Sequence, residues 1–125
     1  MTTSKLSIHD GDPPGFNLEG LREIFRADVA GFAEVFQVIV NDLRDWMSNW
    51  TKARADKDVM AMEKLSHALL GSSGMFGAEQ TSSLARQVCD MLRGSGHAPD
   101  ELLDRLVASV QDNLHQLALR GYVPN

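Results

Sequence analysis

The sequence offers little that could stabilise a fold other than packed apolar side chains. Its 125 residues contain one cysteine, Cys89, so an internal disulfide cannot form. The cysteine and the four histidines do not have the spacing of a structural zinc site. Long apolar runs are lacking too, because no stretch approaches the roughly 18 residues that a membrane span requires. A disulfide framework, a zinc-stabilised fold and a membrane-spanning helix are therefore excluded, which leaves a hydrophobic core.

Positive charge is scarce and scattered along the chain. Lysine and arginine total 12 residues against 17 aspartates and glutamates, which gives a net charge of −5. Binding to nucleic acid depends on clustered cations that neutralise phosphates. The N-terminus also lacks the charged and then apolar pattern of a secretion signal. We therefore expect a cytoplasmic protein that binds other proteins, with no nucleic-acid partner and no membrane partner.

The order of the apolar residues predicts helices. They recur at spacings of three and four, the period of an amphipathic helix, and no segment alternates as a half-buried strand would. A short helix is expected first, followed by four longer ones, over about 18–28, 28–55, 58–76, 81–94 and 99–120. Short connections favour antiparallel neighbours. The predicted fold is all-α, an antiparallel up-down four-helix bundle with the short N-terminal helix laid across one end.

The beginning of the chain differs from the rest in composition. Residues 1–16 carry few apolar side chains and include a turn-forming run at 11–15. We expect residues 1–16 to be a flexible lead-in and residues 17–121 to form a single helical domain. A closed bundle buries its apolar faces internally, which favours a monomer.

The expected third helix has an unusual outer face. Periodicity turns one set of its side chains inward, namely Met62, Leu65, Leu69, Ser72 and Phe76, and it also turns Met91 of the next helix inward. His67 then points to water, and Gly71 and Gly74 lie within about 40° of it around the helix. Each glycine inside a helix costs about 1 kcal/mol relative to alanine. The alternatives are that the helix ends at Gly71, or that the glycines serve a loop or a close helix crossing.

The segment around His67 resembles a known signature. The phosphorylation-site signature of histidine-containing phosphotransfer (HPt) domains is matched by His67, Leu69, Gly71, Ser72, Ser73, Gly77 and Ala78. The likeness extends from about Leu21 to Leu117. It implies a four-helix bundle that carries a phosphoryl group on His67 and exchanges it with an aspartate of a receiver domain. The implied partners are response-regulator receiver domains and a hybrid sensor histidine kinase.

One position departs from the signature. The resemblance implies a lysine beside the phosphoryl group, three residues after the histidine, and this chain has Leu70 there. Two basic residues are candidate substitutes that would support the phosphoryl group: Lys64, one turn before His67, and Arg86, on the facing part of the next helix. For each of them, an ordinary solvated charge is the alternative interpretation.

The chemistry that the residues allow is that of a carrier. The sequence has neither a metal-ligand cluster nor a nucleotide-binding loop, so we expect no cofactor of its own and no enzymatic activity. An exposed imidazole is largely neutral in the cytoplasm and attacks phosphorus without a general base. The Mg²⁺ that phosphoryl transfer uses is expected in the partner receiver. Gly71 and Gly74 would give a receiver access to His67, and Leu70 would add an apolar docking contact.

Two other functions stay open at this point. An HPt-like binding module would use the same surface to regulate a receiver or a kinase without transferring phosphate, and Leu70 in place of lysine is consistent with that. A helical adaptor unrelated to phosphate would require His67, Gly71 and Gly74 to share one face by coincidence. Substitution of His67 separates the first two functions, because only a carrier would lose its activity.

Overall fold

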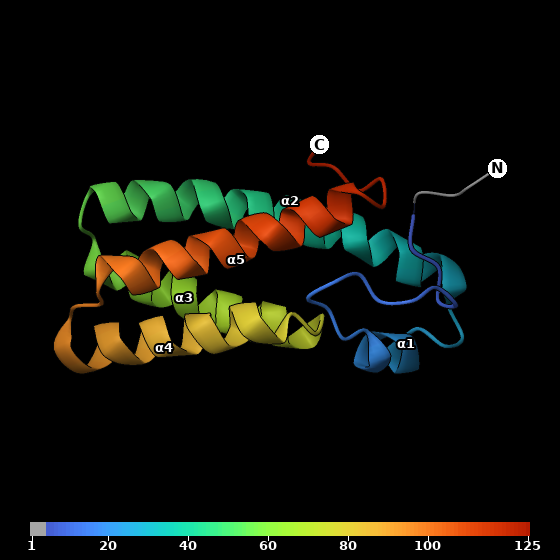
Figure 1. Cartoon of the computed structure of the whole chain (residues 1–125), viewed down its shortest axis with the longest axis horizontal. Helices are drawn as coiled ribbons and strands as arrows, with labels where there is room; N and C mark the ends of the chain where they lie inside the picture. The colour runs from blue at the N-terminus through green and yellow to red at the C-terminus, as the bar shows by residue number, and fades with distance from the viewer. Residues whose placement is uncertain (1–4) are drawn as a thin grey trace.

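The computed structural model describes residues 5–125, and its regular elements are all helices. They are α1 (Glu19–Ile24), α2 (Val29–Ala55), α3 (Val59–Met75), α4 (Glu79–Ser95) and α5 (Asp100–Ala118). Figure 1 shows α2, α3, α4 and α5 running in alternating directions as an antiparallel bundle, with α1 at one end. The predicted all-α bundle with a short N-terminal helix is therefore confirmed.

Local capping explains where α2 and α3 begin and where α3 ends. The Asp28 carboxylate accepts a hydrogen bond from the Gly31 N–H at 2.9 Å, and the Asp58 carboxylate accepts one from the Ala61 N–H at 3.1 Å. Each bond satisfies a backbone donor that the first helical turn leaves unpaired. Just past α3, Gly77 adopts a φ of +74°, a left-handed conformation that ends the helix.

Side chains from the four long helices form one hydrophobic core. Phe32 and Phe36 of α2 meet edge to face, with ring centroids 5.2 Å apart. Farther along α2, Trp46 and Trp50 stack with centroids 5.0 Å apart. The other three helices contribute buried aliphatic side chains that include Leu69, Val88, Leu106, Val110 and Leu117. This burial fixes the helix that carries His67 against its neighbours.

The segment before α1 is packed against the bundle. Leu6 is 1% exposed and Phe16 is 8% exposed, and the Phe16 ring lies 6.0 Å from the Phe76 ring at the end of α3. Residues 5–16, expected to be a flexible lead-in, are therefore packed in the structure, while residues 1–4 lie outside the described part of the chain. Composition was misleading here because a few well-placed apolar side chains are enough to dock a loop.

Arg22 of α1 holds this N-terminal segment in place. Its guanidinium donates hydrogen bonds to the backbone carbonyls of Ile8, at 3.1 Å, and Asp10. It also pairs with the Asp12 carboxylate at 2.6 Å. The several donors of one guanidinium can satisfy separate acceptors along a loop, which a lysine could not do in the same geometry.

The chain also stays packed past residue 121, the predicted end of the domain. Tyr122 is 1% exposed, and its hydroxyl donates to the Ala33 carbonyl of α2 at 2.8 Å. The Gln37 side chain donates to the Val123 carbonyl at 2.7 Å. Both ends of the described chain therefore contribute to the packing of the bundle.

The contact between α3 and α4 is the most extensive between any two helices of the described chain, and we call it the α3–α4 seam. Both helices carry small buried side chains, including Ser66 and Ser73 on α3 and Ala85 on α4. The Ser82 hydroxyl of α4 donates to the Leu70 carbonyl of α3 at 3.2 Å. Small side chains allow the two backbones to approach closely, and this rigidly positions the outer face of α3.

Candidate functional site

His67 lies near the middle of α3, and its side chain is exposed as predicted. Within residues 5–125 the imidazole forms no hydrogen bond and no ion pair. Helix α3 continues for two turns past it, so the ring projects from a regular helix and not from a loop. Both ring nitrogens are therefore open to a partner.

The inner face of α3 differs from the prediction. Ser72, expected to face inward, is exposed, whereas Ser66 and Ser73 are fully buried. The Ser66 hydroxyl donates to the Glu63 carbonyl at 2.9 Å, and the Ser73 hydroxyl donates to the Leu69 carbonyl. A serine that bonds to its own helix can be buried without losing a hydrogen bond. A pattern that treats serine as polar misses this arrangement.

The exposure of two other residues differs from the prediction. Leu70, expected to be exposed, is half-buried and packs against the core. Met91 of α4, expected to face inward, is 39% exposed, and its neighbour Cys89 is buried at 2%. Leu70 and Cys89 both lie at the seam, where the Leu70 carbonyl accepts from Ser82 and the Cys89 sulfur donates to the Glu63 carbonyl.

The two glycines of α3 have different surroundings. A Cβ added at Gly71 would meet no atom within 4 Å, whereas one added at Gly74 would lie 3.6 Å from the Ser82 hydroxyl oxygen. Because α3 runs to Met75, the alternative that the helix ends at Gly71 is excluded. At Gly74 that distance is an ordinary van der Waals contact, so a close helix crossing does not require a glycine there either. No contact within the described chain requires the absence of a side chain at Gly71, which lies one turn from His67.

The basic residues predicted to support the site lie on two helices. Lys64 and Arg86 are both exposed. Ser82 contacts the Leu70 carbonyl and the Cys89 sulfur contacts the Glu63 carbonyl, at 3.2 Å and 3.9 Å. This antiparallel register places Arg86 level with residues 66 and 67 of α3.

A neighbouring arginine shows that side chains in this row of α4 can reach α3. Arg93, two turns from Arg86 on the same side of the helix, hydrogen-bonds the Glu63 carboxylate at 2.7 Å. The hydrogen bond that Arg93 donates to Glu63 raises the pKa of Arg93 above its usual value, and the nearby Cys89 adds to the shift. Arg86 belongs to the same row of α4 and lies level with residues 66 and 67 of α3.

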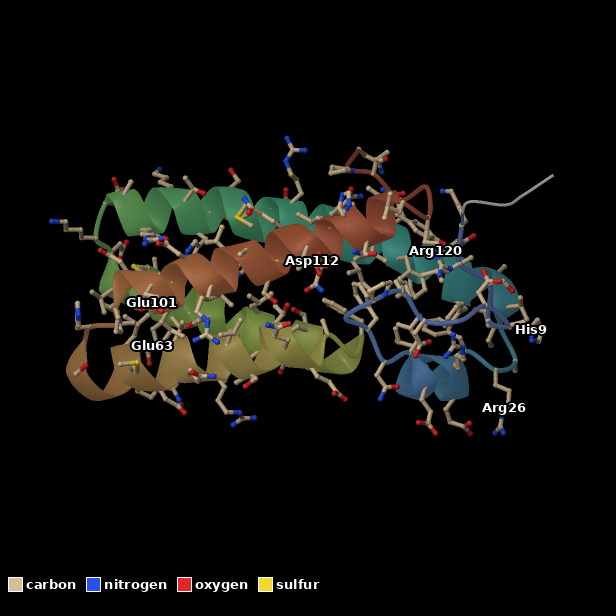
Figure 2. The ribbon with its side chains drawn as sticks, in the orientation of Figure 1. His9, Arg26, Glu63, Glu101, Asp112 and Arg120 are labelled. Atoms are coloured by element: carbon tan, nitrogen blue, oxygen red, sulfur yellow. The ribbon has the colours of Figure 1, made fainter. Side chains whose placement is uncertain are left out.

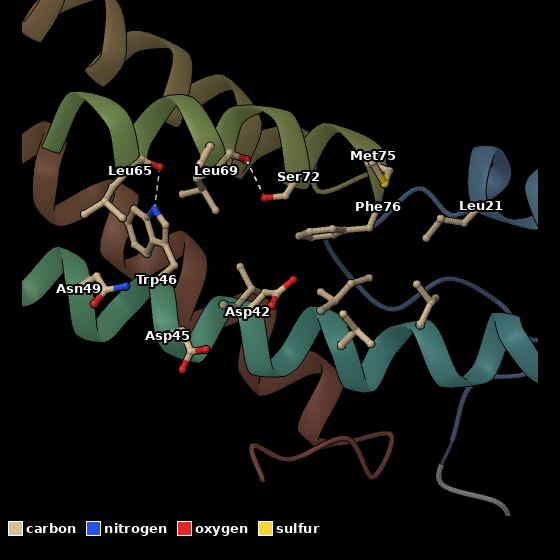
Figure 3. A pocket seen from close by; sticks show the side chains of 15 residues that line it. Leu21, Asp42, Asp45, Trp46, Asn49, Leu65, Leu69, Ser72, Met75 and Phe76 are labelled. Carbon is tan, nitrogen blue, oxygen red and sulfur yellow. Dashed lines mark hydrogen bonds between the residues drawn. The ribbon is translucent and has the colours of Figure 1, made fainter. Parts of the chain in front are cut away.

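A groove lies on the other flank of α3, between this helix and α2. It has a volume of about 480 Å³ and is lined mostly by apolar side chains, among them Leu43, Leu65, Leu69 and Phe76. We call it the α2–α3 groove. Figure 3 shows Trp46 reaching across from α2, where its Nε1–H donates to the Leu65 carbonyl at 2.8 Å. Ala68, the residue after His67, also lines the groove.

The sequence alone did not reveal this groove. The available signal was Val38, a large apolar residue on the side of α2 that also carries Asp42 and Asp45. In the structure Val38 is 57% exposed and lies at the groove, together with Met75 of α3, which is 69% exposed. Large exposed apolar side chains beside a hollow are typical of an interaction surface.

The described chain shows neither a metal site nor a membrane helix. No three side chains among its histidines, cysteines, aspartates and glutamates gather closely enough to hold a metal ion. No helix over residues 5–125 is both long enough and apolar enough to cross a bilayer. The exposed His67 is followed in the chain by Ala68, which lines the α2–α3 groove.

Comparison with known protein families identifies this arrangement. The Hpt domain family model matches residues 21–119, which covers α2 to α5 in full, and the chain belongs to this family. Hpt domains are histidine phosphotransfer modules of two-component systems, act as phosphocarriers, and interact with receiver domains and histidine kinases. Searches of curated proteins and of solved structures returned no match.

Proposed function

We propose that the protein is a phosphorelay carrier in which His67 accepts a phosphoryl group from one receiver aspartate and passes it to another. Two observations carry this proposal. The imidazole of His67 is exposed and has no partner within residues 5–125. Gly71, one turn away, has no side chain although an added Cβ would meet no atom within 4 Å. The membership of the Hpt family supplies the class of reaction.

The transfer step follows from the chemistry of the imidazole. The Nε2 lone pair of a neutral His67 attacks the phosphorus of an aspartyl phosphate, so a P–N bond forms as the P–O bond to aspartate breaks. The aspartate leaves as a carboxylate, and the Nδ1 proton stays on the ring. The return step onto a second aspartate reverses these changes. Mg²⁺ bound in the receiver offsets the charge on the phosphoryl oxygens.

Lys64 and Arg86 support the phosphoryl group in this proposal. Lys64 precedes His67 by one turn, and the register of the seam places Arg86 level with it on α4. Leu70 packs against the core. The position three residues after the histidine therefore carries no charge, where the family has a lysine. In this proposal the charge next to the phosphoryl group comes from Lys64 and Arg86 and not from the position three residues after the histidine.

The partners and the setting follow from the same role. Receiver domains of response regulators dock over His67 and Gly71, with Gly74 and Leu70 at the edge of the contact. A hybrid sensor histidine kinase supplies the phosphoryl group upstream. In this proposal the protein works in the cytoplasm as a monomer, with most of its large apolar side chains inside a single core. It needs no cofactor of its own.

One observation favours a second function. Leu70 stands where the family has lysine, which is consistent with a binding module that regulates a receiver or kinase without transfer. In that case His67 would be part of a docking surface only. The two functions differ in one measurable property, the formation of phosphohistidine.

The test is phosphotransfer from a panel of phosphorylated receiver domains in the presence of Mg²⁺. A carrier acquires an acid-labile, alkali-stable label that is absent from His67→Gln, while His115→Gln serves as the matched histidine control because His115 is also exposed on a helix. If the wild-type protein bound at least one receiver but acquired no phosphoryl label, the carrier proposal would be overturned and the binding module established.

A further inference from the structure

Polar side chains meet between α4 and α5. The Thr81 hydroxyl of α4 donates a hydrogen bond to Asn113 Oδ1 of α5 at 2.6 Å, and its oxygen lies 2.5 Å from the Ser109 hydroxyl oxygen. Because Thr81 has one hydroxyl proton and gives it to Asn113, Ser109 is the donor to Thr81. The hydrogen bonds therefore run from Ser109 through Thr81 and end at Asn113 Oδ1.

The other half of the Asn113 amide has no partner. Asn113 is 3% exposed, and within residues 5–125 its Nδ2 group donates no hydrogen bond. The Nδ2 atom lies toward Gly15 of the N-terminal segment, where an added Cβ would be 3.7 Å from it. Buried side-chain donors are satisfied in the large majority of cases by protein, water or a ligand. The amide of Asn113 is thus a buried donor that is available to a ligand.

A pocket with a volume of about 290 Å³ lies at this donor, and we call it the α4–α5 pocket. Its walls come from α4, α5 and the segment before α1, and its lining includes Gly15, Leu84, Arg105, Ala108, Asp112 and Asn113. Gly15 has a φ of +87°, a conformation that favours glycine, so this wall carries no side chain. The N-terminal segment that packs on the bundle therefore completes a pocket.

Arg105 and Asp112 bring opposite charges to the α4–α5 pocket. Both side chains are exposed, and within the described residues 5–125 neither forms an ion pair or a hydrogen bond. They lie two turns apart on the same side of α5. Figure 2 shows Asp112 on α5 where the N-terminal segment passes, and an added Cβ on Gly15 would lie 3.9 Å from its carboxylate. The pocket thus offers a cation, an anion and a buried neutral donor.

We infer that the α4–α5 pocket binds a free α-amino acid. Its carboxylate accepts hydrogen bonds from Asn113 Nδ2 and the Arg105 guanidinium, and its ammonium group pairs with the Asp112 carboxylate. A simple anion would leave Asp112 without a partner, and a simple cation would leave Arg105 and Asn113 without one. A zwitterion satisfies all three groups.

The size and the apolar wall of the pocket fit the same ligand. A volume of about 290 Å³ is at the lower end of the range for ligand pockets, which suits a small molecule. Leu84 and Ala108 offer an apolar surface to the side chain of the amino acid. The α4–α5 pocket shares no residue with the phosphotransfer site, so this inference does not rest on the proposed function. Phosphotransfer in the absence of an amino acid should not depend on the pocket.

The test titrates the full chain with a panel of L-amino acids. Two NMR signals report binding at the pocket, the side-chain amide of Asn113 and the backbone amide of Gly15, and the melting temperature reports stabilisation by the ligand. For each amino acid that binds, the matched probes are the acid without its ammonium group and the amine without its carboxylate, such as propionate and ethylamine for L-alanine. We expect an amino acid to shift both signals and raise the melting temperature, and its two matched probes to do neither at the same concentration.

Two double variants that leave the net charge unchanged test the charged groups. Arg105→Gln with Asp112→Asn removes one charge of each sign from the pocket. Glu34→Gln with Arg44→Gln removes the same charges from exposed positions on α2, outside the lining. The pocket variant should bind the amino acid about tenfold more weakly, because it loses two charged partners, and the α2 variant should match the wild type. Equal affinities for the two double variants would overturn the inference.

Asn113→Asp tests the buried donor. The substitution keeps an oxygen that accepts from Thr81, but it replaces the Nδ2 donor with a carboxylate oxygen that repels the carboxylate of the ligand. The variant, shown to be folded by circular dichroism, should lose binding. If it does not fold, the exposed double variant decides the question. Wild-type affinity in folded Asn113→Asp, no signal shift with any amino acid of the panel, or equal shifts with the acid or the amine alone would each overturn the inference.

Discussion

The two flanks of α3 are built in different ways. Toward α4 the flank is closed, with the Ser82 hydroxyl bonded to the Leu70 carbonyl and only 3.6 Å from where a Cβ of Gly74 would be. Toward α2 the flank is open as a groove of about 480 Å³ with Val38 and Met75 exposed beside it. His67 lies on the ridge between the two.

This difference shows what each flank contributes. The closed flank fixes the helix and sets the register that brings Arg86 level with His67. The open flank offers space and apolar surface to a partner. Gly74 belongs to the closed flank and Gly71 to the open one, where an added Cβ would meet no atom within 4 Å. Two glycines that look alike in the sequence therefore lie on different flanks of the helix.

The largest expected effect is that of Gly77→Ala, which changes the turn joining α3 to α4 on the closed flank. Gly77 has a φ of +74°, and a Cβ there would overlap the carbonyl of Asn17. The strain and the overlap together should lower the free energy of unfolding by about 3 kcal/mol. Urea unfolding monitored by circular dichroism measures the loss.

Gly96→Ala is the control for that variant. Gly96 has nearly the same conformation, with a φ of +72°, but an added Cβ would meet nothing within 4 Å. Its expected loss is the strain alone, about 1 kcal/mol. Equal losses for the two variants would contradict the close approach of residue 17 to the turn.

The need for open space beside His67 is tested with Gly71→Gln, which adds a long side chain on the open flank. The new side chain should keep a receiver from reaching His67 and lower the rate of phosphotransfer by about a hundredfold. The fold should be retained or slightly stabilised, because a helical glycine is replaced by a better helix former. Gly71→Ala is the matched control and should transfer at close to the wild-type rate. Normal transfer by Gly71→Gln would refute the need for clearance.

A smaller effect is expected for the charge that α4 places beside His67. Arg86→Gln should slow phosphotransfer by about fivefold or less, the usual size of an exposed charge interaction. Adding Leu70→Lys to that variant should restore the rate by supplying the family's charge from α3. Single-turnover transfer measures both, and Arg105→Gln on α5 is the control. A rate unchanged by Arg86→Gln would mark Arg86 as an ordinary solvated charge.

The smallest effect concerns stability at high pH, away from both flanks. Burial raises the pKa of Tyr122 above its usual value of 10.0, and Asp10 adds to the shift, whereas a backbone hydrogen bond at Leu6 lowers it. The unfolded chain therefore loses the phenolic proton first as the pH rises, and stability should fall above about pH 10. The measurement is the free energy of unfolding against pH for the wild type and Tyr122→Phe. If the free energy of unfolding fell equally steeply with pH in the wild type and in Tyr122→Phe, the pH dependence could not be assigned to Tyr122.

The sequence predicted the bundle because its apolar residues repeat at helical spacing and its connections are short. The exposure of His67 followed from the same periodicity. Periodicity did not predict Ser66 and Ser73 in the core, since their hydroxyls bond to carbonyls of their own helix. It also misplaced Leu70, whose burial depends on how closely α4 approaches. The first feature depends on hydrogen bonds within one helix, and the second on contact between two helices.

The N-terminal segment shows the same limitation. Residues 5–16 have the composition of a loop, yet Arg22 and two apolar side chains dock them on the bundle. The α2–α3 groove was missed for a related reason, because a hollow is a property of two helices together. One helix alone reveals only exposed apolar residues such as Val38.

The central claim is tested most directly by locating the phosphoryl group. The wild-type protein is incubated with Mg²⁺ and phosphorylated receiver domains, digested under alkaline conditions that preserve phosphohistidine, and mapped by mass spectrometry. We predict a single modified residue, His67, with the signal lost in His67→Gln. A phosphoryl group on His97 or His115, or none at all while a receiver remains bound, would contradict the account.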